Sequence, residues 1–409
     1  MTILPSRRRV VRRVAPRAFT LVELMVASVM AFIIVAAGSE LAASMVRAIR
    51  KYEEQGELGS RAAISASFIK SALGSAGYNW TAEHVISSSE STGSYGRGHC
   101  LTATNICPDK LVRPLEICRS SDVSETTCTA PTSTSADAIR TIVPRDGTIE
   151  AVTIQDLATP PLLSTCSLST GGVSFTVKGT TRAAWAVNDL VMVTNNNHVN
   201  IGRVATAFPL NADATLARTL VLELVDATGD LVLDDGASLD PCSAKASLFR
   251  AEVIRVKQVI VKHDNTAKAL LYGERTSSAG AMAFSELTAE VEDFGAQLEI
   301  VRIPGPSSAP VGVHAFCTAD NTKSLYETDA SRLLTGACAG ERLNGDLAAG
   351  PANRVIGLQL GLVLRSNVAT QIGAESVTGV FDRTEIVATD KRLHRKSFFY
   401  LGLPNANAF

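Results

Sequence analysis

Residues 19–39 read FTLVELMVASVMAFIIVAAGS, a run of 21 residues in which Glu23 is the single charge. As a helix, this run is about 30 Å long, which is enough to cross the hydrocarbon core of a bilayer. No other stretch of the sequence combines this length with so few charges. The run therefore predicts a membrane-spanning helix close to the amino terminus.

Basic residues lie on one side of the apolar run only. The first 18 residues hold six arginines and no acid. The positive-inside rule then places residues 1–18 in the cytoplasm and exports everything after roughly residue 45. The formal net charge of −1 is therefore uneven, because the other 391 residues carry 33 basic and 40 acidic side chains, a net charge of −7. An acidic body argues against general binding to nucleic-acid phosphates, so no nucleic-acid partner is expected.

Three interpretations of this amino terminus compete. The first is a signal peptide cut near residues 36–38. The second is a plain single-pass anchor, and the third is a prepilin-type leader cut before the apolar run. Glu23 separates them, because a carboxylate inside a membrane helix costs about 2.5–3.5 kcal/mol on insertion scales. An acid in that position is expected to have a function and a partner, and only the third interpretation supplies them.

Residues 18–25, AFTLVELM, resemble the type IV prepilin motif, usually written as Gly followed by F-T-L-x-E. The resemblance implies cleavage between Ala18 and Phe19 by a prepilin peptidase, and N-methylation of Phe19. It also implies that Glu23 pairs with the amino terminus of a neighbouring subunit during assembly, since a buried acid and a buried amine neutralise each other. One departure is Ala18, which stands where the motif has Gly.

The helix is expected to continue to residue 76. Apolar or small residues recur on one face at steps of four and three, namely Leu58, Ala62, Ser65, Ile69, Ala72 and Ala76. Gly77 is the expected C-cap, and Gly38, Gly56 and Gly59 are expected weak points. A helix of about 87 Å makes sense if residues 19–45 pack against copies in a filament and residues 46–80 pack on the protein's own sheet.

The stretch from Arg61 to Tyr78, which ends LGSAGY, is similar to the PilW group of minor pilins, and so are residues 187–193, 291–294 and 354–360. This resemblance implies a type IV pilin-like α+β fold, with the long helix packed on an antiparallel β-rich domain. It implies a structural minor pilin in the tip or initiation complex of a pilus, held in the inner membrane before assembly at the cell surface. The implied partners are the major pilin, other minor pilins, a PilY-type tip protein, the prepilin peptidase and the inner-membrane assembly platform.

The exported part divides by composition. Residues 81–138 are rich in Ser, Thr and Gly, which predicts a disulfide-rich loop region, and residues 139–409 predict a β-rich domain. Expected strands are 138–143, 149–155, 186–194, 219–225, 253–262, 356–364 and 398–401. Apolar and polar residues alternate clearly over 253–262.

Eight cysteines follow the membrane segment: Cys100, Cys107, Cys118, Cys128, Cys166, Cys242, Cys317 and Cys338. Their even number and an oxidising compartment predict four disulfides. Local pairing favours Cys317 with Cys338, and the first four cysteines among themselves. A zinc site is the rival interpretation, although the closely spaced pairs of zinc knuckles are missing.

No catalytic motif stands out, so the sequence favours an assembly protein without a cofactor over an enzyme. The six histidines are expected to be solvated. The acidic stretch 229–236, with Asp240, suggests either a Ca²⁺ site or a plain hairpin turn. Residues 391–396, KRLHRK, suggest either a surface for DNA or an acidic partner, or a strand with alternately exposed charges, and the strand is favoured. Trp80 and Trp185 are expected in the core.

Two further functions remain open from the sequence. A type II secretion pseudopilin would share the same amino terminus and helix. An adhesin or DNA-uptake subunit would use residues 81–140 and 305–350 as its binding surface.

Overall fold

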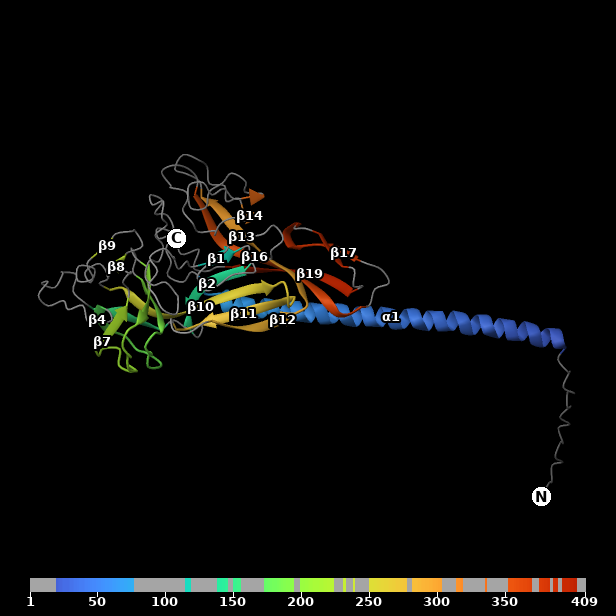
Figure 1. Ribbon diagram of the computed structural model, residues 1–409, viewed down its shortest axis with the longest axis horizontal. Helices are drawn as coiled ribbons and strands as arrows, with labels where there is room; N and C mark the ends of the chain where they lie inside the picture. The colour runs from blue at the N-terminus through green and yellow to red at the C-terminus, as the bar shows by residue number, and fades with distance from the viewer. Residues whose placement is uncertain are drawn as a thin grey trace, which may run out of the picture. The chain divides into compact units, whose positions relative to one another are not determined.

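The computed structural model describes residues 20–76, 115–118, 138–145, 150–155, 173–194, 199–223, 231–232, 238–239, 250–277, 282–303, 314–318, 335–336, 352–369, 375–382, 385–388 and 392–402. The chain forms two compact units, Met1–Glu54 and Gln55–Phe409. Helix α1 (Leu21–Leu73) begins in the first unit and ends in the second (Figure 1). Its 53 residues make it about 80 Å long. The predicted long amino-terminal helix is thus confirmed, and Gly77, the expected C-cap, lies outside the described residues.

One stripe of α1 is buried in the second unit. The buried residues of the helix are Leu58, Ala62, Ser65, Ile69 and Leu73, and Ala76 follows in the turn after the helix. This confirms the predicted face of the helix. The one difference is at its end, where Leu73 is fully buried and the predicted Ala72 is half-buried beside it. The helix also runs unbroken through its glycines. Because Gly59 has no side chain, the guanidinium of Arg395 can lie against the helix at this point. A Cβ at residue 59 would be only 2.7 Å from Nη1 of Arg395.

The first sheet is a five-stranded antiparallel arrangement on which part of α1 packs. Its order is β1 (Leu115–Cys118), β2 (Ala138–Pro144), β10 (Glu252–Asp264), β11 (Ala269–Arg275) and β12 (Ala283–Ala289). Only residues 256–262 of β10 pair with β2. The first residues of β10 therefore remain available for other strands.

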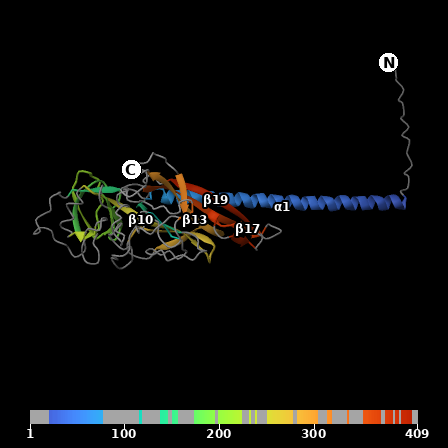
Figure 2. The same cartoon turned by 90° about the horizontal axis from the view of Figure 1, so that it is seen from above.

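Those first residues close a six-stranded antiparallel barrel. The barrel follows the order β10, β3 (Ala151–Ile154), β4 (Val173–Lys178), β7 (Arg218–Glu223), β6 (Val199–Val204), β5 (Leu190–Thr194) and back to β10. Its strands lie together in both views (Figures 1 and 2). Buried side chains such as Phe175, Trp185 and Phe208 fill the interior. Trp185 is therefore a core residue, as predicted, and the closed ring leaves no free strand edges.

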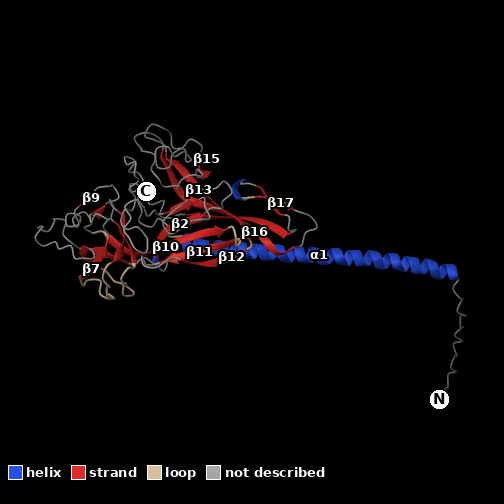
Figure 3. Cartoon of the chain, in the orientation of Figure 1, coloured by secondary structure: helices blue, strands red, loops and turns tan. Residues whose placement is uncertain are grey.

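The second sheet has the order β15 (Thr335–Gly336), β14 (His314–Thr318), β13 (Val291–Ile303), β16 (Ala352–Ala369) and β19 (Arg392–Gly402). Two small hairpins, β8 (Leu231–Val232) with β9 (Ser238–Leu239) and β17 (Glu375–Thr378) with β18 (Glu385–Ala388), form separate two-stranded sheets. A short 3₁₀ turn, η3 (Val380–Asp382), lies between the last two. Strands dominate the described chain after α1, as Figure 3 shows.

Both sheets and the helix share one hydrophobic core. Leucines of β16 and apolar residues of β2, β10, β11, β13 and β19 meet the buried stripe of α1 in a single cluster. The fold is therefore a long helix packed on antiparallel sheets, and the predicted α+β class is confirmed.

Several predicted strands differ in detail from the observed ones. Both faces of β10 are covered, so the alternation over 253–262 does not mark a solvent-facing side. Strand β5 begins only at Leu190, because Asn188 has a left-handed backbone (φ 70°) and the Asp189 carboxylate accepts the Ala186 N–H, which makes a turn. Strand β1 lies inside the segment expected to be a loop region. The hairpin of β8 and β9 agrees with the hairpin interpretation of residues 229–236, whose acidic residues lie outside the described ones.

The buried stripe predicts unequal effects of two isoleucines on α1. Replacing Ile69, which is fully buried, by Ala should lower the free energy of unfolding by about 2–5 kcal/mol, because it leaves a cavity between helix and sheets. The matched change Ile64→Ala, on the exposed face, should alter it by less than about 0.5 kcal/mol. Urea unfolding of the full chain in detergent, followed by circular dichroism, measures both. Equal losses would show that the stripe is not the packed face.

Candidate functional site: the amino-terminal helix and its anchorage

The first part of α1 is an apolar surface. Every residue from Thr20 to Glu53 is exposed, and the large apolar side chains include Leu21, Phe32 and Ile34, with exposed fractions of 77, 76 and 70%. The helix is long and apolar enough to cross a membrane, and none of its most apolar window is buried. A surface of this kind marks a contact with lipid or with other chains.

The first turn of α1 is closed by a capping box. The Thr20 hydroxyl accepts the Glu23 N–H (3.3 Å), while Oε2 of Glu23 accepts both the Thr20 N–H and the Thr20 hydroxyl (3.0 Å each). This reciprocal pair satisfies two backbone donors that a helix start leaves open. The T-x-x-E spacing was readable in the sequence, but Glu23 was there assigned only to subunit assembly. Ala18 and Phe19 lie outside the described residues.

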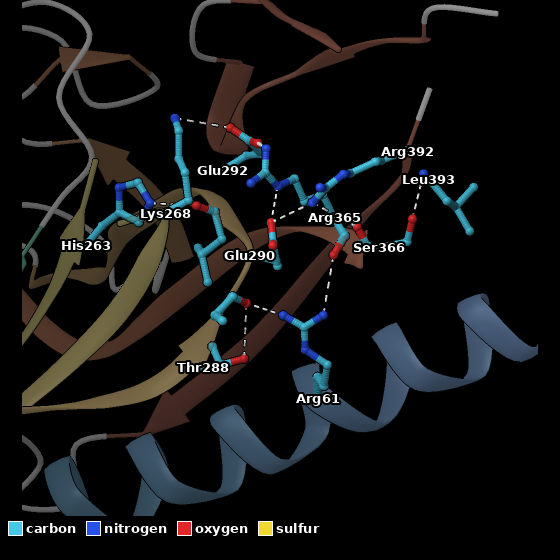
Figure 4. A network of polar contacts seen from close by, with 12 residues as sticks. Arg61, His263, Lys268, Thr288, Glu290, Glu292, Arg365, Ser366, Arg392 and Leu393 are labelled. Carbon is cyan, nitrogen blue, oxygen red and sulfur yellow. Dashed lines mark hydrogen bonds and ion pairs between the residues drawn. The ribbon is translucent and has the colours of Figure 1, made fainter. Parts of the chain in front are cut away.

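Arg61 anchors the second part of α1 to the sheets. Its guanidinium donates to the carbonyl oxygens of Ala289, at the end of β12, and of Arg365, on β16 (3.3 Å for the latter; Figure 4). The arginine fork reaches the two carbonyls with two separate nitrogens held in one plane, a geometry that an ammonium group does not have. Arg61 therefore ties the helix to both sheets at once.

Glu290 is the corner where the chain passes from the first sheet to the second. It is the one residue between β12 and β13, and its backbone is left-handed (φ 56°), which costs a non-glycine residue about 1 kcal/mol or more. Its carboxylate accepts from Arg365 and from Arg392 (3.0 Å), and its carbonyl accepts the Arg365 N–H (2.9 Å). Burial raises the pKa of Glu290, but the two arginines outweigh burial and hold that pKa below its ordinary value.

Glu292 and Lys268 extend the same polar network. Glu292 forms ion pairs with Arg365 (2.9 Å) and with Lys268 (3.2 Å). The Val291 N–H between the two glutamates donates to the Lys268 carbonyl (2.8 Å), so the corner is joined to the turn between β10 and β11. Figure 4 shows this network from the Arg61 side chain to Arg392. It is a structural joint of helix, first sheet and second sheet.

His263 is buried beneath this joint, which corrects the expectation that the histidines are solvated. It lies on β10 with no exposed surface, and its Nε2 is 2.7 Å from the Val291 carbonyl. Since a carbonyl only accepts, Nε2 carries the proton, and Nδ1 has no partner among the described residues. Burial lowers the pKa of His263, and the Lys268 charge lowers it further, against the Val291 hydrogen bond and the charges of Asp293 and Glu292.

The basic cluster lies on β19, which confirms the favoured strand interpretation for the described part, 392–396. Its charges make contacts that the sequence did not indicate. Arg392 binds Glu290, Arg395 donates to the Gln55 carbonyl of α1 (2.9 Å), and Lys396 donates to the Thr378 hydroxyl. Arg395 is thus a second tie between α1 and the second sheet.

A buried ionic cluster joins the barrel to the first sheet. Arg255 of β10 contacts Glu150 (3.5 Å) and Asp189 (3.3 Å), and Arg145, which follows β2, contacts Asp189 (3.0 Å). The Trp185 indole N–H donates to Glu150 (3.2 Å). These residues stand where the chain enters or leaves the barrel, so they fix the barrel on the strand that it shares with the sheet.

Two of the eight cysteines fall on described strands, Cys118 on β1 and Cys317 on β14. Cys317 is the register partner of Gly336, two residues before Cys338 in the chain. The Cys317–Cys338 disulfide stays a prediction, and the other six cysteines lie outside the described residues. Within the described ranges, no group of three or more His, Cys, Asp and Glu side chains is arranged to hold a metal.

Comparison with known proteins adds little. No protein-family model matches the chain. No curated protein matches it either. Among solved structures, the chain is similar to a type IV-like pilin from Thermus thermophilus, with 13% identity and a TM-score of 0.20 over 37% of this chain and 69% of that one. The α+β fold is therefore assigned from the helix and the sheets themselves.

The anchorage predicts that Arg61 cannot be replaced by another cation. Arg61→Lys should lower the free energy of unfolding by about 1–3 kcal/mol, because at least one carbonyl at the sheet corner loses its donor. The control is Arg47→Lys, since Arg47 is exposed and, among the described residues, bonds to the Ala43 carbonyl of its own helix alone. Urea unfolding of the two variants compares them. If both retain wild-type stability, Arg61 is not an anchor.

The buried histidine predicts a pH dependence of stability. Because the pKa of His263 is lowered in the folded state, only the unfolded chain takes up its proton as the pH falls below about 6.5. Stability should therefore fall from pH 6.5 to 5.5, by at most about 1.4 kcal/mol from this residue. His263→Gln should flatten this part of the curve. The Glu290 ion pairs also make stability depend on pH, but in a lower range. Because the pKa of the Glu290 carboxyl is lowered in the folded state, their contribution to stability is lost only below about pH 4.3. Parallel curves for the wild type and the variant between pH 5.5 and 6.5 would refute this assignment.

Proposed function

We propose that the protein is a structural subunit of a type IV pilus, of the minor pilin kind. The observation that carries the proposal is that the two parts of helix α1 have different surroundings. Its first part exposes apolar side chains on all sides, and its second part is fixed by a buried stripe and by Arg61 to the protein's own sheets. A helix built in this way is suited to pack among other helices while it holds a separate β-rich head.

The proposed maturation follows from the leader motif. The chain is inserted in the inner membrane with residues 1–18 in the cytoplasm, cut between Ala18 and Phe19, and methylated on Phe19. Removal of the leader takes away six arginines and leaves an acidic chain. Glu23 then caps α1 within its own chain and, in the assembled filament, neutralises the amino terminus of a neighbour.

The proposed place is the tip or initiation complex, as for the PilW group. The partners would be other minor pilins, the major pilin and a PilY-type tip protein, after contact with the prepilin peptidase and the assembly platform. The bulk of the head supports this place. A head that adds a closed barrel to a pilin-like sheet would crowd a filament in which every subunit carried it. The role is assembly, with no catalysis and no cofactor.

A type II secretion pseudopilin is the second candidate, because the exposed helix serves either assembly equally well. The barrel favours the pilus, since it offers a large extra surface that a tip subunit can use. Neighbouring genes separate the two candidates, as minor pilin and tip-protein genes would mark the pilus.

Substitutions at Glu23 test the proposed assembly. Glu23→Gln keeps a capping side chain at this position but removes the charge, whereas Thr20→Ala removes the cap and keeps the charge. Charge pairing predicts at least about tenfold less Glu23→Gln protein in sheared surface filaments, because the buried amine loses its counter-charge. Thr20→Ala should be incorporated nearly normally. Immunoblots of filament and membrane fractions measure incorporation, and mass spectrometry checks that leader cleavage is unchanged.

Two outcomes would contradict the proposal. Wild-type incorporation of Glu23→Gln would remove the charge-pairing argument. Unchanged surface piliation after deletion of the gene would remove the assembly role itself.

A further inference from the structure

Strand β19 is the last strand of the second sheet, and one of its edges is unpaired in the described part of the chain. It pairs with β16 along one side, and no strand of the described chain pairs with the other. Its last six residues, SFFYLG (397–402), contain no charge and no proline. Natural edge strands are usually protected by charge, proline or bulges, because unpaired N–H and C=O groups recruit other strands. The second half of this edge, residues 397–402, lacks those protections, whereas Arg392, Arg395 and Lys396 charge its first half. An added strand would therefore meet charge at one end and an unprotected apolar stretch at the other.

Two aromatic side chains of β19 lie on the face away from α1 and lean toward β16. Phe398 and Tyr400 are 50% and 44% exposed. Tyr400 leans over β16, where its ring and hydroxyl occupy the space that a Cβ at Gly357 would need. Burial and the Glu299 carboxylate raise the pKa of Tyr400 to about 12. The rings are thus held in place by the sheet and still present half of their surface.

A strained turn lies beside these rings, over β13 and β16. Phe381 in η3 has a left-handed backbone (φ 52°), and its ring centroid is 5.5 Å from that of Phe398. The buried Asp293 carboxylate accepts the Val380 N–H (2.8 Å) and holds the turn. A strained non-glycine residue beside exposed aromatic rings is typical of binding sites, where the fold sets side chains in place before the partner arrives.

The charge along β19 indicates the chemistry of the partner. Arg392 is neutralised by Glu290, but Arg395 and Lys396 contact the neutral Gln55 carbonyl and Thr378 hydroxyl. No acid of the described chain forms an ion pair with Arg395 or Lys396. Within the described residues, the edge therefore carries two cations without an acidic partner, followed by an apolar aromatic stretch.

We propose that an extended segment of a different polypeptide adds to the open edge of β19 as a further strand. Its acidic end would lie beside Arg395 and Lys396, and its apolar side chains would pack beside Phe398 and Tyr400. A second copy of β19 does not fit, because the strand carries no acid that could neutralise these cations. This inference goes beyond the pilin role and does not depend on it.

Binding of defined peptides to the purified full chain in detergent tests the proposal. The probe is a fluorescein-labelled peptide of alternating Val and Thr with two Asp residues at one end, made in both orders so that parallel and antiparallel addition are covered. Saturable binding is expected by fluorescence anisotropy. Lys396→Glu should weaken it about fivefold to tenfold and should strengthen binding of the matched peptide with two Lys residues by a similar factor. Lys178→Glu, an equal charge change at an exposed position of the barrel, should change neither.

A second probe asks whether the backbone edge is used. Methylation of alternate backbone nitrogens in the acidic peptide removes the donors that a strand needs, so binding should be lost. The proposal is overturned if wild-type protein shows no saturable binding, if the methylated peptide binds equally well, or if the charge exchange has no effect. Self-association that the peptide displaces would also overturn it, because the occupant would then be a second copy. If Lys396→Glu lowers the urea midpoint, Lys396→Ala replaces it, with an expected weakening of about threefold.

Discussion

One stripe of α1, from Leu58 to Leu73, is buried in a core that belongs to two sheets at once. The hydrophobic free energy of this burial fixes the helix, but it also forces both sheets to bring their apolar faces to the same helix. The chain must then change sheets sharply between β12 and β13, and it does so at one left-handed residue, Glu290. The polar network around that residue follows from this geometry. At the end of a strand, carbonyls lose their ladder partners, and Arg61 and Arg365 supply donors there.

The same strand, β10, explains how a second body is added without a second core around the helix. Its first residues close the barrel, and its later residues lie in the sheet under α1. The barrel has its own filled interior, so it needs no support from the helix. The buried contacts of Arg255 with Glu150 and Asp189 then join the two bodies at the point where β10 passes between them. Buried ion pairs of this kind add little to stability, and here they hold the barrel in one orientation on the first sheet.

What the sequence could predict depends on how local each signal is. The buried face of α1 followed from a three-and-four spacing that any helix converts into one side. The capping role of Glu23 was equally local and was missed because its position in an apolar run directed attention to assembly. The barrel could not be predicted, because it depends on which of several β-rich segments pair with residues 252–255. The burial of His263 depended in the same way on neighbours far along the chain, and so did the partner of Arg61, 228 residues away. Charged residues of β19 looked like a solvated face because their acceptors, on α1, β17 and the sheet corner, are equally remote in sequence.

The central claim is that the apolar first part of α1 becomes a filament component whose mature chain starts at Phe19. Mass spectrometry of the protein recovered from sheared surface filaments tests it most directly. The account predicts a mature chain of 391 residues that begins with N-methylated Phe19. A chain that retains its arginine-rich leader, or one that begins after the apolar run near residue 38, would contradict it.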